Sequence, residues 1–196
     1  MNILNLYSGI GGNRKLWGDE HSITAIEINE DIAKVYKDFF PNDKVFICDA
    51  HTFLEDHYKE FDFIWSSPPC QSHSRARYTF QVKGRNANAL FPDLKLYEEI
   101  IFLKNYFNGK WVVENVIPFY TPLIKPNNLL QRHYVWSNFY IFNKVFLSDD
   151  LIYSQISDLS KKFGFDLSKY KLKNKRQILR NCVTPELGKY ILECVK

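Results

Sequence analysis

The chain has 196 residues, a length that suits one domain with a sizeable hydrophobic core. Apolar residues make up 45% of it and charged residues 24%, which excludes an intrinsically disordered chain. The formal net charge of +4 permits a polyanionic partner without requiring one.

Cysteine spacing and the N-terminal sequence indicate the setting in which the chain works. The four cysteines lie far apart, with no CxxC pair and no histidine cluster, so we expect no metal and a reducing, cytoplasmic setting. Residues 1–7 carry no basic stretch and run directly into glycines, which argues against a signal peptide. No apolar run approaches membrane-spanning length, so we expect no membrane partner.

Short apolar runs alternate with segments of helical periodicity through the first two thirds of the chain. We expect strands at residues 3–7, 23–27, 44–48, 61–65 and 111–114. We expect helices between them at residues 12–17, 31–39, 52–58 and 94–107. This alternation predicts an α/β fold with a mostly parallel twisted sheet and helices on both faces. The spacing of about twenty residues between strands fits right-handed crossovers.

Two stretches fall outside this alternation. Residues 71–92 form a long polar segment, and a loop of that length in a compact domain is usually functional or mobile. This segment carries four basic residues, Arg75, Arg77, Lys83 and Arg85. In the second stretch, residues 117–176, we interpret 136–142 as a strand and the lysine-rich segment 161–175 as a solvated surface.

A glycine-rich turn follows the first strand and opens the next helix. In residues 7–12 (YSGIGG) the glycines permit a tight turn and close backbone approach, and the helix N-terminus offers free amides. The second and third strands end in acids: Glu27 suits two ribose hydroxyls, and Asp49 is placed to accept from an adenine amine. The alternative for both acids is capping of the next helix. Together these features predict a nucleoside-bearing cofactor at the carboxyl edge of the sheet.

A proline pair ends the fourth strand and presents a thiol. Pro68 and Pro69 cannot extend the hydrogen bonding of the strand, so the chain leaves the sheet there with Cys70 and Gln71 on a loop. An isolated cysteine is equally compatible with a small buried hydrophobe. The residue alone therefore leaves both interpretations open.

The order of the motifs resembles that of the cytosine-5 DNA methyltransferases, which depend on S-adenosylmethionine. Residues 5–12 resemble the first motif of that family and Glu27 its second, while residues 68–74 match its catalytic PPCQxxS loop. Downstream, residues 114–116 match its Glu-Asn-Val motif, and residues 176–178 and 181–185 resemble its last motifs. The resemblance implies a Rossmann-like S-adenosylmethionine-dependent methyltransferase fold, S-adenosylmethionine as cofactor and DNA as partner.

The resemblance also implies roles for individual residues. Cys70 would be the covalent nucleophile, Glu114 would hydrogen-bond ring nitrogen 3 and the exocyclic amine, and Arg132 would contact the ring carbonyl oxygen. The nucleophile needs a thiol pKa lowered by neighbouring cations or backbone amides. The implied cofactor-binding residues are Tyr7, Gly9, Gly11, Gly12, Glu27, Ile28, Asp49, Pro68, Asn181 and Val183. The implied nucleic-acid contacts are Gln71, Ser74, Arg75, Arg77, Lys83 and Arg85, on a loop that would clamp DNA around a flipped base.

The chain departs from the family pattern in three places. Residues 5–7 read Asn-Leu-Tyr where the family usually has Asp-Leu-Phe, and the QxRxR motif is reduced to Arg132-His133-Tyr134. The large target-recognition domain is missing, since only residues 139–175 are available for it. We therefore expect a single catalytic domain over residues 1–196, with a minimal recognition region at about residues 117–175. We expect a monomer that reads a short DNA sequence.

Other functions stay open at the level of sequence. They are RNA methylation, methylation of a nucleotide, a non-catalytic binder, and a catalytic subunit that needs a separate recognition partner. The Cys-Phe-Thr tripeptide expected of the branch that acts on transfer RNA is absent. Abundant Lys, Asn, Ile, Phe and Tyr fit an AT-rich bacterium or its phage, and both restriction–modification and protection of phage DNA suit such a source.

Overall fold

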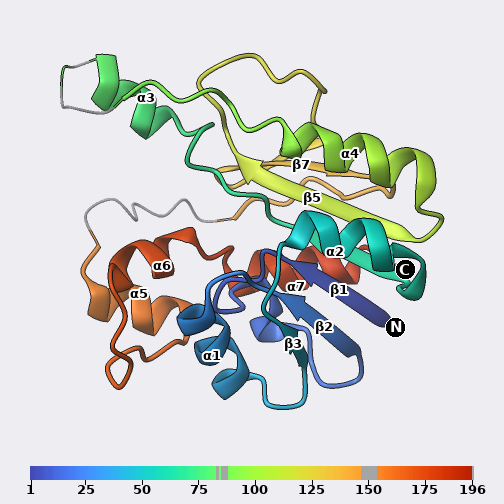
Figure 1. Cartoon of the computed structure of the whole chain (residues 1–196), viewed down its shortest axis with the longest axis horizontal. Helices are drawn as coiled ribbons and strands as arrows, with labels where there is room; N and C mark the ends of the chain where they lie inside the picture. The colour runs from blue at the N-terminus through green and yellow to red at the C-terminus, as the bar shows by residue number, and fades with distance from the viewer. Residues whose placement is uncertain (83, 85–87, 147–153, 196) are drawn as a thin grey trace.

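The computed structural model describes residues 1–82, 84, 88–146 and 154–195. In that part of the chain seven strands form one sheet in the order β3-β2-β1-β4-β5-β7-β6 (Figure 1). Strands β1 to β5 run parallel to one another. Strand β7 pairs antiparallel with β5, and β6 pairs antiparallel with β7. The strands are β1 (Asn2–Leu6), β2 (Ser22–Ile26), β3 (Lys44–Phe46), β4 (Phe63–Ser66), β5 (Lys110–Val116), β6 (Asn128–Leu130) and β7 (His133–Ser137).

Helices connect the strands and follow the sheet in the C-terminal part. They are η1 (Asn13–Leu16), α1 (Glu30–Phe39), α2 (Ala50–His57), η2 (Tyr58–Glu60), α3 (Arg75–Val82), α4 (Lys95–Tyr106), α5 (Ile156–Phe163), α6 (Lys175–Asn181) and α7 (Pro185–Glu193). Asn29 caps α1 by accepting a hydrogen bond from the Ile32 N–H. Pro185 opens α7, where its missing N–H leaves no intrahelical bond unmade.

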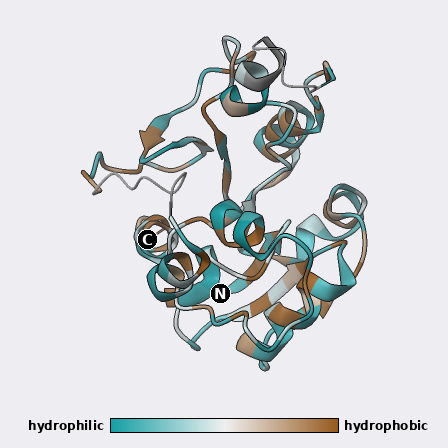
Figure 2. Ribbon diagram, turned by 90° about the vertical axis from the view of Figure 1, so that its left-hand side faces the viewer, coloured by the Kyte–Doolittle hydropathy of each residue, from teal (hydrophilic) through white to brown (hydrophobic). Residues whose placement is uncertain are grey.

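Helices cover both faces of the sheet, as the alternation of strands and helices predicts. Adjacent residues of β1 point to opposite sides: Ile3 packs in a cluster with α7, and Leu4 packs in a cluster with α2 and α4. A third cluster joins β2 to α1, α5 and α6. Strands covered on both faces carry apolar side chains on both sides, and Figure 2 shows hydrophobic colour on several of them.

The predicted fold class is confirmed, and the five parallel strands lie within a few residues of their predicted positions. The helices expected at 31–39, 52–58 and 94–107 are α1, α2 and α4. The segment expected as a helix at 12–17 is the short 3-10 helix η1.

Three sequence-based expectations were wrong in part. Residues 71–92 are not one continuous loop, because α3 begins at Arg75. The strand expected at 136–142 ends at Ser137, because the side chain of Asn138 takes over the pairing: it accepts from the Trp111 N–H (3.0 Å) and donates to the Gly109 carbonyl (2.8 Å). The lysine-rich segment 161–175 also buries apolar side chains, since Phe163 and Phe165 lie in the core.

Neither a membrane-spanning helix nor a metal-binding cluster occurs among the described residues. No helix in them has the length and apolar content to cross a membrane. No three His, Cys, Asp or Glu side chains in them come together as ligands for a metal ion.

Candidate active site

The carboxyl ends of the parallel strands β1, β2, β4 and β5 converge on one cavity of about 370 Å³. The glycine-rich turn follows β1, Glu27 follows β2, the proline pair follows β4, and Glu114 lies near the end of β5. Strand β7 runs the other way, so its first residue, His133, reaches the same edge. The sequence-predicted residues that line the cavity are Tyr7, Gly9, Gly12, Glu27, Ile28, Pro68, Cys70, Gln71, Ser74, Glu114, Arg132, Asn181 and Val183.

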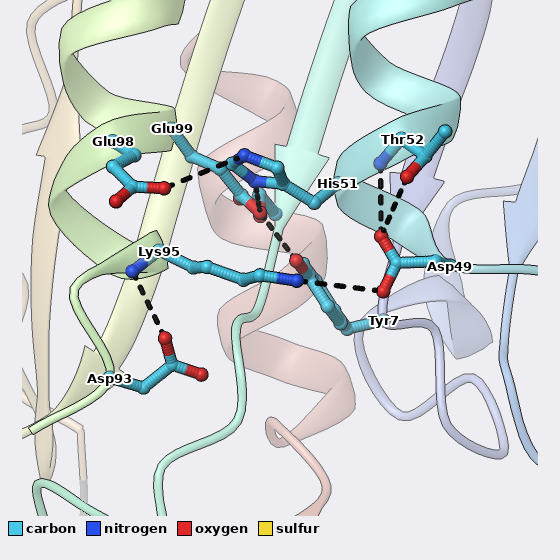
Figure 3. A network of polar contacts seen from close by, with 9 residues as sticks. Tyr7, Asp49, His51, Thr52, Asp93, Lys95, Glu98 and Glu99 are labelled. Carbon is cyan, nitrogen blue, oxygen red and sulfur yellow. Dashed lines mark hydrogen bonds and ion pairs between the residues drawn. The ribbon is translucent and has the colours of Figure 1, made fainter. Parts of the chain in front are cut away.

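Four predicted site residues that the structure describes do not line this cavity. Gly11 is not among the lining residues. Asp49 caps α2: its carboxylate accepts from the Thr52 N–H (3.0 Å) and lies 3.7 Å from Lys95 Nζ (Figure 3). The guanidinium groups of Arg75 and Arg77 donate to the carbonyls of Pro118 and Asn88. Lys83 and Arg85 lie outside the described residues.

Backbone and side-chain hydrogen bonds hold the loop that carries Cys70. The Asn115 amide donates to the Pro68 carbonyl (2.8 Å), which ties the end of β5 to the turn after β4. The Cys70 carbonyl accepts from the N–H groups of His73 and Ser74 (3.1 and 3.0 Å). Asn115 is 2% exposed, so this tie is shielded from water. The thiol therefore has a fixed place in the cavity.

Cys70 and Glu114 both resist ionisation in this cavity. Burial raises the pKa of Glu114 to about 7, although a hydrogen bond with Ser67 and the charge of Arg132 oppose the shift. Burial also raises the pKa of Cys70, and the Glu114 carboxylate adds to that rise, whereas Arg132 lowers it. The sequence-based expectation of a lowered thiol pKa is therefore not met in the structure, because desolvation outweighs the nearby cation.

Arg132 joins the cavity to the C-terminal segment. Its Nη2 donates to the carbonyl of Arg180 (2.7 Å) and of Cys182 (3.2 Å), at the end of α6. This segment also packs directly on the glycine-rich turn, since a Cβ on Gly12 would lie 2.6 Å from the Val183 carbonyl oxygen. Only glycine permits this approach, which brings residues near both ends of the chain to one wall of the cavity.

The turn after β1 and Glu27 together form a polar recess. Glu27 accepts from the N–H of Gly9 (3.0 Å) on one carboxylate oxygen and from that of Asn29 (2.9 Å) on the other. The carboxylate also accepts from the Ile28 N–H, and its two oxygens together keep acceptor capacity for a hydroxyl donor. Gly9 has φ 55°, and a Cβ there would meet no atom within 4 Å, so its open side faces free space. The buried Ser8 Oγ has no hydrogen-bond partner among the described residues.

The buried carboxylate of Glu99 holds the start of the glycine-rich turn through Tyr7 (Figure 3). Glu99 on α4 is 0% exposed, and it accepts from the Tyr7 hydroxyl and from Ser66 Oγ (2.5 Å). His51 Nδ1 lies 3.2 Å from the same carboxylate, which raises the pKa of His51. Tyr7 has φ 54°, so the network holds a left-handed residue at the start of the turn.

Sequence reasoning missed Glu99, although a signal for it existed. Glu99 lies between the buried residues Leu96, Ile100 and Leu103 of α4, at a position where helical periodicity calls for an apolar side chain. An acid on the buried face of a helix almost always has partners. His51 and Ser66 carry no comparable signal in the sequence.

Comparison with known proteins adds a family assignment for part of the chain. The family model for C-5 cytosine-specific DNA methylase matches residues 1–119. No curated protein sequence matches the chain.

Solved structures are similar over part of the chain. A DNMT2 mutant from Spodoptera frugiperda is 29% identical with a TM-score of 0.40, over 59% of this chain and 35% of that one. The methyltransferase EhMeth from Entamoeba histolytica is 18% identical with a TM-score of 0.46, over 81% and 59%. A SAM-dependent methyltransferase from Agrobacterium tumefaciens is 12% identical with a TM-score of 0.45, over 62% and 40%. The chain thus spans less than two thirds of each of these proteins.

Proposed function

The chain belongs to the C-5 cytosine-specific DNA methylase family, and on that premise we propose that it methylates carbon 5 of cytosine in DNA. The observation that carries the proposal is one cavity lined by Cys70, Glu114 and the glycine-rich turn. A thiol, a carboxyl group and a nucleoside-binding turn are the groups that this reaction needs at one place.

S-adenosylmethionine is the methyl donor of this family, and the polar recess beside Gly9 fits it. The buried Ser8 Oγ lacks a partner, the Glu27 carboxylate has free lone pairs, and Gly9 leaves open space. We infer that Glu27 holds the two ribose hydroxyls, with Tyr7, Ile28, Pro68, Asn181 and Val183 around the molecule. When bound, the cofactor supplies the electrophilic methyl group that carbon 5 accepts.

Cys70 supplies the covalent step of the proposed mechanism. Its thiolate adds to carbon 6 of cytosine, a carbon–sulfur bond forms, and the electrons of the 5,6 double bond move into the ring. Carbon 5 thereby becomes a nucleophile. After methylation a base takes the proton from carbon 5, and the electron pair left behind restores the double bond and expels the thiolate. The thiol is thus regenerated.

Glu114 supplies a proton-bearing group beside the ring. With its pKa raised to about 7, this side chain is substantially protonated at neutral pH and can donate to ring nitrogen 3. In that form it also no longer repels the Cys70 thiolate, because the charge of the carboxylate adds to the rise in thiol pKa that burial causes. Donation to the ring and activation of the thiol therefore depend on the same proton.

Duplex DNA must present its target base outside the stack to reach this cavity. Gln71 and Ser74 line the cavity, and α3, which carries Arg75 and Arg77, projects from the body of the molecule (Figure 1). We infer that this region contacts phosphates next to the flipped base. Lys83 and Arg85, in the same stretch of sequence, would add positive charge to it.

The proposed function is tested by the substrate that accepts the methyl group. Purified protein is incubated with radiolabelled S-adenosylmethionine and either duplex DNA, transfer RNA or cytidine nucleotides. We expect label on duplex DNA. Label on transfer RNA or on nucleotides alone would identify that molecule, and not DNA, as the substrate. Label on none of them would favour a catalytic subunit that requires a recognition partner.

Replacement of Glu27 by alanine is expected to weaken S-adenosylmethionine binding by about 1–3 kcal/mol, because hydrogen bonds from two hydroxyls to a charged group are lost. This corresponds to a roughly 5- to 150-fold rise in Kd, measured by calorimetric titration. Glu30→Ala is the matched control, since Glu30 is exposed and does not line the cavity. Equal affinities of Glu27→Ala and wild type would place the cofactor elsewhere.

The recognition sequence is expected to be short, roughly two to four base pairs, because each base-edge contact needs its own positioned side chain. Affinity should rest mainly on phosphate contacts and should fall steeply with salt. Bisulfite sequencing of a random DNA library treated with the protein identifies the recognition sequence. Binding titrations at two salt concentrations measure how DNA affinity depends on salt. Methylation confined to a site of six or more base pairs would contradict this prediction.

A further inference from the structure

His51 is a partly buried histidine beside the glycine-rich turn, and the mechanism above gives it no role. It lies in the first turn of α2, its side chain is 18% exposed, and its Nδ1 lies 3.2 Å from the carboxylate of Glu99 (Figure 3). That carboxylate is fully buried and also accepts from the hydroxyls of Tyr7 and Ser66. A carboxylate oxygen only accepts, so Nδ1 carries the proton of this contact. A chain of contacts therefore runs from the glycine-rich turn through Glu99 to His51.

The negative charge of Glu99 needs a counter-charge, because the carboxylate is shielded from water. The hydroxyls of Tyr7 and Ser66 donate hydrogen bonds but bring no positive charge, and a buried carboxylate without a cation is strongly disfavoured. The imidazolium form of His51 supplies that cation at hydrogen-bond distance. The neutral form keeps the hydrogen bond but leaves the negative charge uncompensated. The protonation of His51 therefore determines how stable the network is when it is buried.

The charged groups around His51 favour its protonated form on balance. The hydrogen bond with Glu99 and the charge of that carboxylate raise the pKa of His51 above its ordinary value of 6.5, whereas burial of the ring lowers it. Glu55 on α2 adds to the rise, and Glu98 Oε2 on α4 lies 3.7 Å from Nε2 on the other side of the ring. The ammonium of Lys95 opposes the rise, although it pairs with the capping carboxylate of α2 (Figure 3).

Tyr7 connects this charge to the cofactor recess. It lines the cavity beside Ser8 and Gly9, and its φ of 54° is a left-handed conformation that is strained for a residue with a Cβ. Its hydroxyl, which a phenylalanine at this position would lack, ties it to Glu99 in that conformation. A molecule in the recess keeps water away from this side of the network. The carboxylate then depends more strongly on its counter-charge than in the free protein.

We propose that His51 is a positioning residue for S-adenosylmethionine: its imidazolium neutralises the buried Glu99 carboxylate and thereby keeps Tyr7 in place at the cofactor recess. This inference rests on the cofactor site of the proposed function. Binding of the cofactor and binding of a proton to His51 then favour each other. Because the complex holds the proton more tightly, the gain in affinity is complete below the pKa of His51 in the free protein. It is lost as pH rises through the pKa of His51 in the complex.

The test compares wild type with His51→Gln, which can still donate a hydrogen bond to Glu99 but never carries a charge. His57→Gln is the matched control, since His57 lies on the same helix, pairs with Glu60 and does not line the cavity. Calorimetric titration gives the Kd of S-adenosylmethionine at pH 6 and pH 9, and Tm shows that each variant is folded. We expect His51→Gln to bind about tenfold more weakly than wild type at pH 6 and equally at pH 9, since a pKa that differs by about one unit between free protein and complex changes Kd tenfold. The control should match wild type at both pH values.

Glu99→Gln gives a second, independent measurement. It removes the buried charge, so wild-type affinity should fall about tenfold relative to that of Glu99→Gln between pH 6 and pH 9. A ratio of Kd between His51→Gln and wild type that is the same at both pH values would overturn the inference and leave the proposed function intact. If His51→Gln fails to fold, the ratio for Glu99→Gln decides, and an unchanged ratio overturns the inference. Wild type without measurable affinity at either pH would overturn the inference together with the cofactor site on which it rests.

Discussion

Cys70→Ala is expected to lower methyl transfer by about 10⁴-fold or more, because without the thiolate nothing adds to carbon 6 and carbon 5 stays unreactive. The substitution removes one sulfur atom from a loop that backbone bonds and Asn115 hold in place. S-adenosylmethionine affinity and Tm should therefore stay close to wild type. Transfer of radiolabel to duplex DNA and calorimetric titration measure the two quantities.

Cys48→Ala is the matched control for this prediction. Cys48 is a free, half-buried cysteine that does not line the cavity, so its loss should leave methyl transfer unchanged. Equal losses of methyl transfer in Cys48→Ala and Cys70→Ala would indicate a general effect of removing a thiol. Methylation that persists in Cys70→Ala would remove this residue from the mechanism.

Glu114→Gln is expected to lower the rate of methyl transfer by about 10²- to 10⁴-fold, the range for loss of a positioned acid. Glutamine keeps the size of the side chain but has no acidic proton to share with ring nitrogen 3. Single-turnover rates at saturating DNA measure the effect, and the binding of S-adenosylmethionine should not change. A rate within a few fold of wild type would contradict the assigned role.

The same substitution should change how stability depends on pH. The pKa of Glu114 is raised from its ordinary value of 4.5 to about 7, so between these values the folded protein holds a proton that the unfolded chain has released. The free energy of unfolding must then fall as pH rises through this window, by about 2–3 kcal/mol between pH 5 and pH 8. Glu114→Gln lacks this contribution.

Urea unfolding of both proteins at pH 5 and pH 8 measures this difference. The free energy of unfolding of Glu114→Gln, relative to that of wild type, should increase by about 2–3 kcal/mol from pH 5 to pH 8. The comparison between the two proteins removes the contribution of the titrating groups whose pKa values Glu114 does not affect. An identical pH dependence in both would mean that the carboxyl group is hydrated in the folded state.

The parallel sheet and much of the site were predictable because both depend on local patterns. Strands buried on two faces read as apolar runs, and their carboxyl ends meet at one edge, which places Glu27 and Cys70 together. Asp49 shows the limit of this reasoning. A strand-end acid equally suits a helix cap, and the structure shows it in that position.

Features that depend on contacts between distant segments could not be predicted in the same way. The end of β7 is set by the side chain of Asn138 on the backbone near Gly109. The partners of Arg132 lie 48 and 50 residues further along the chain. The raised pKa of Cys70 follows from burial beside Glu114, a property of the assembled cavity that no motif encodes.

Covalent trapping tests the central claim, that Cys70 attacks a cytosine of DNA. Duplex DNA with 5-fluorocytosine at the target blocks the final elimination, because fluorine on carbon 5 cannot leave as a proton does. Incubated with S-adenosylmethionine, the wild-type protein should form a denaturation-resistant complex, and peptide mass spectrometry should place the base on Cys70. Methylation of ordinary DNA without any trapped complex, or a complex through another residue, would contradict the account.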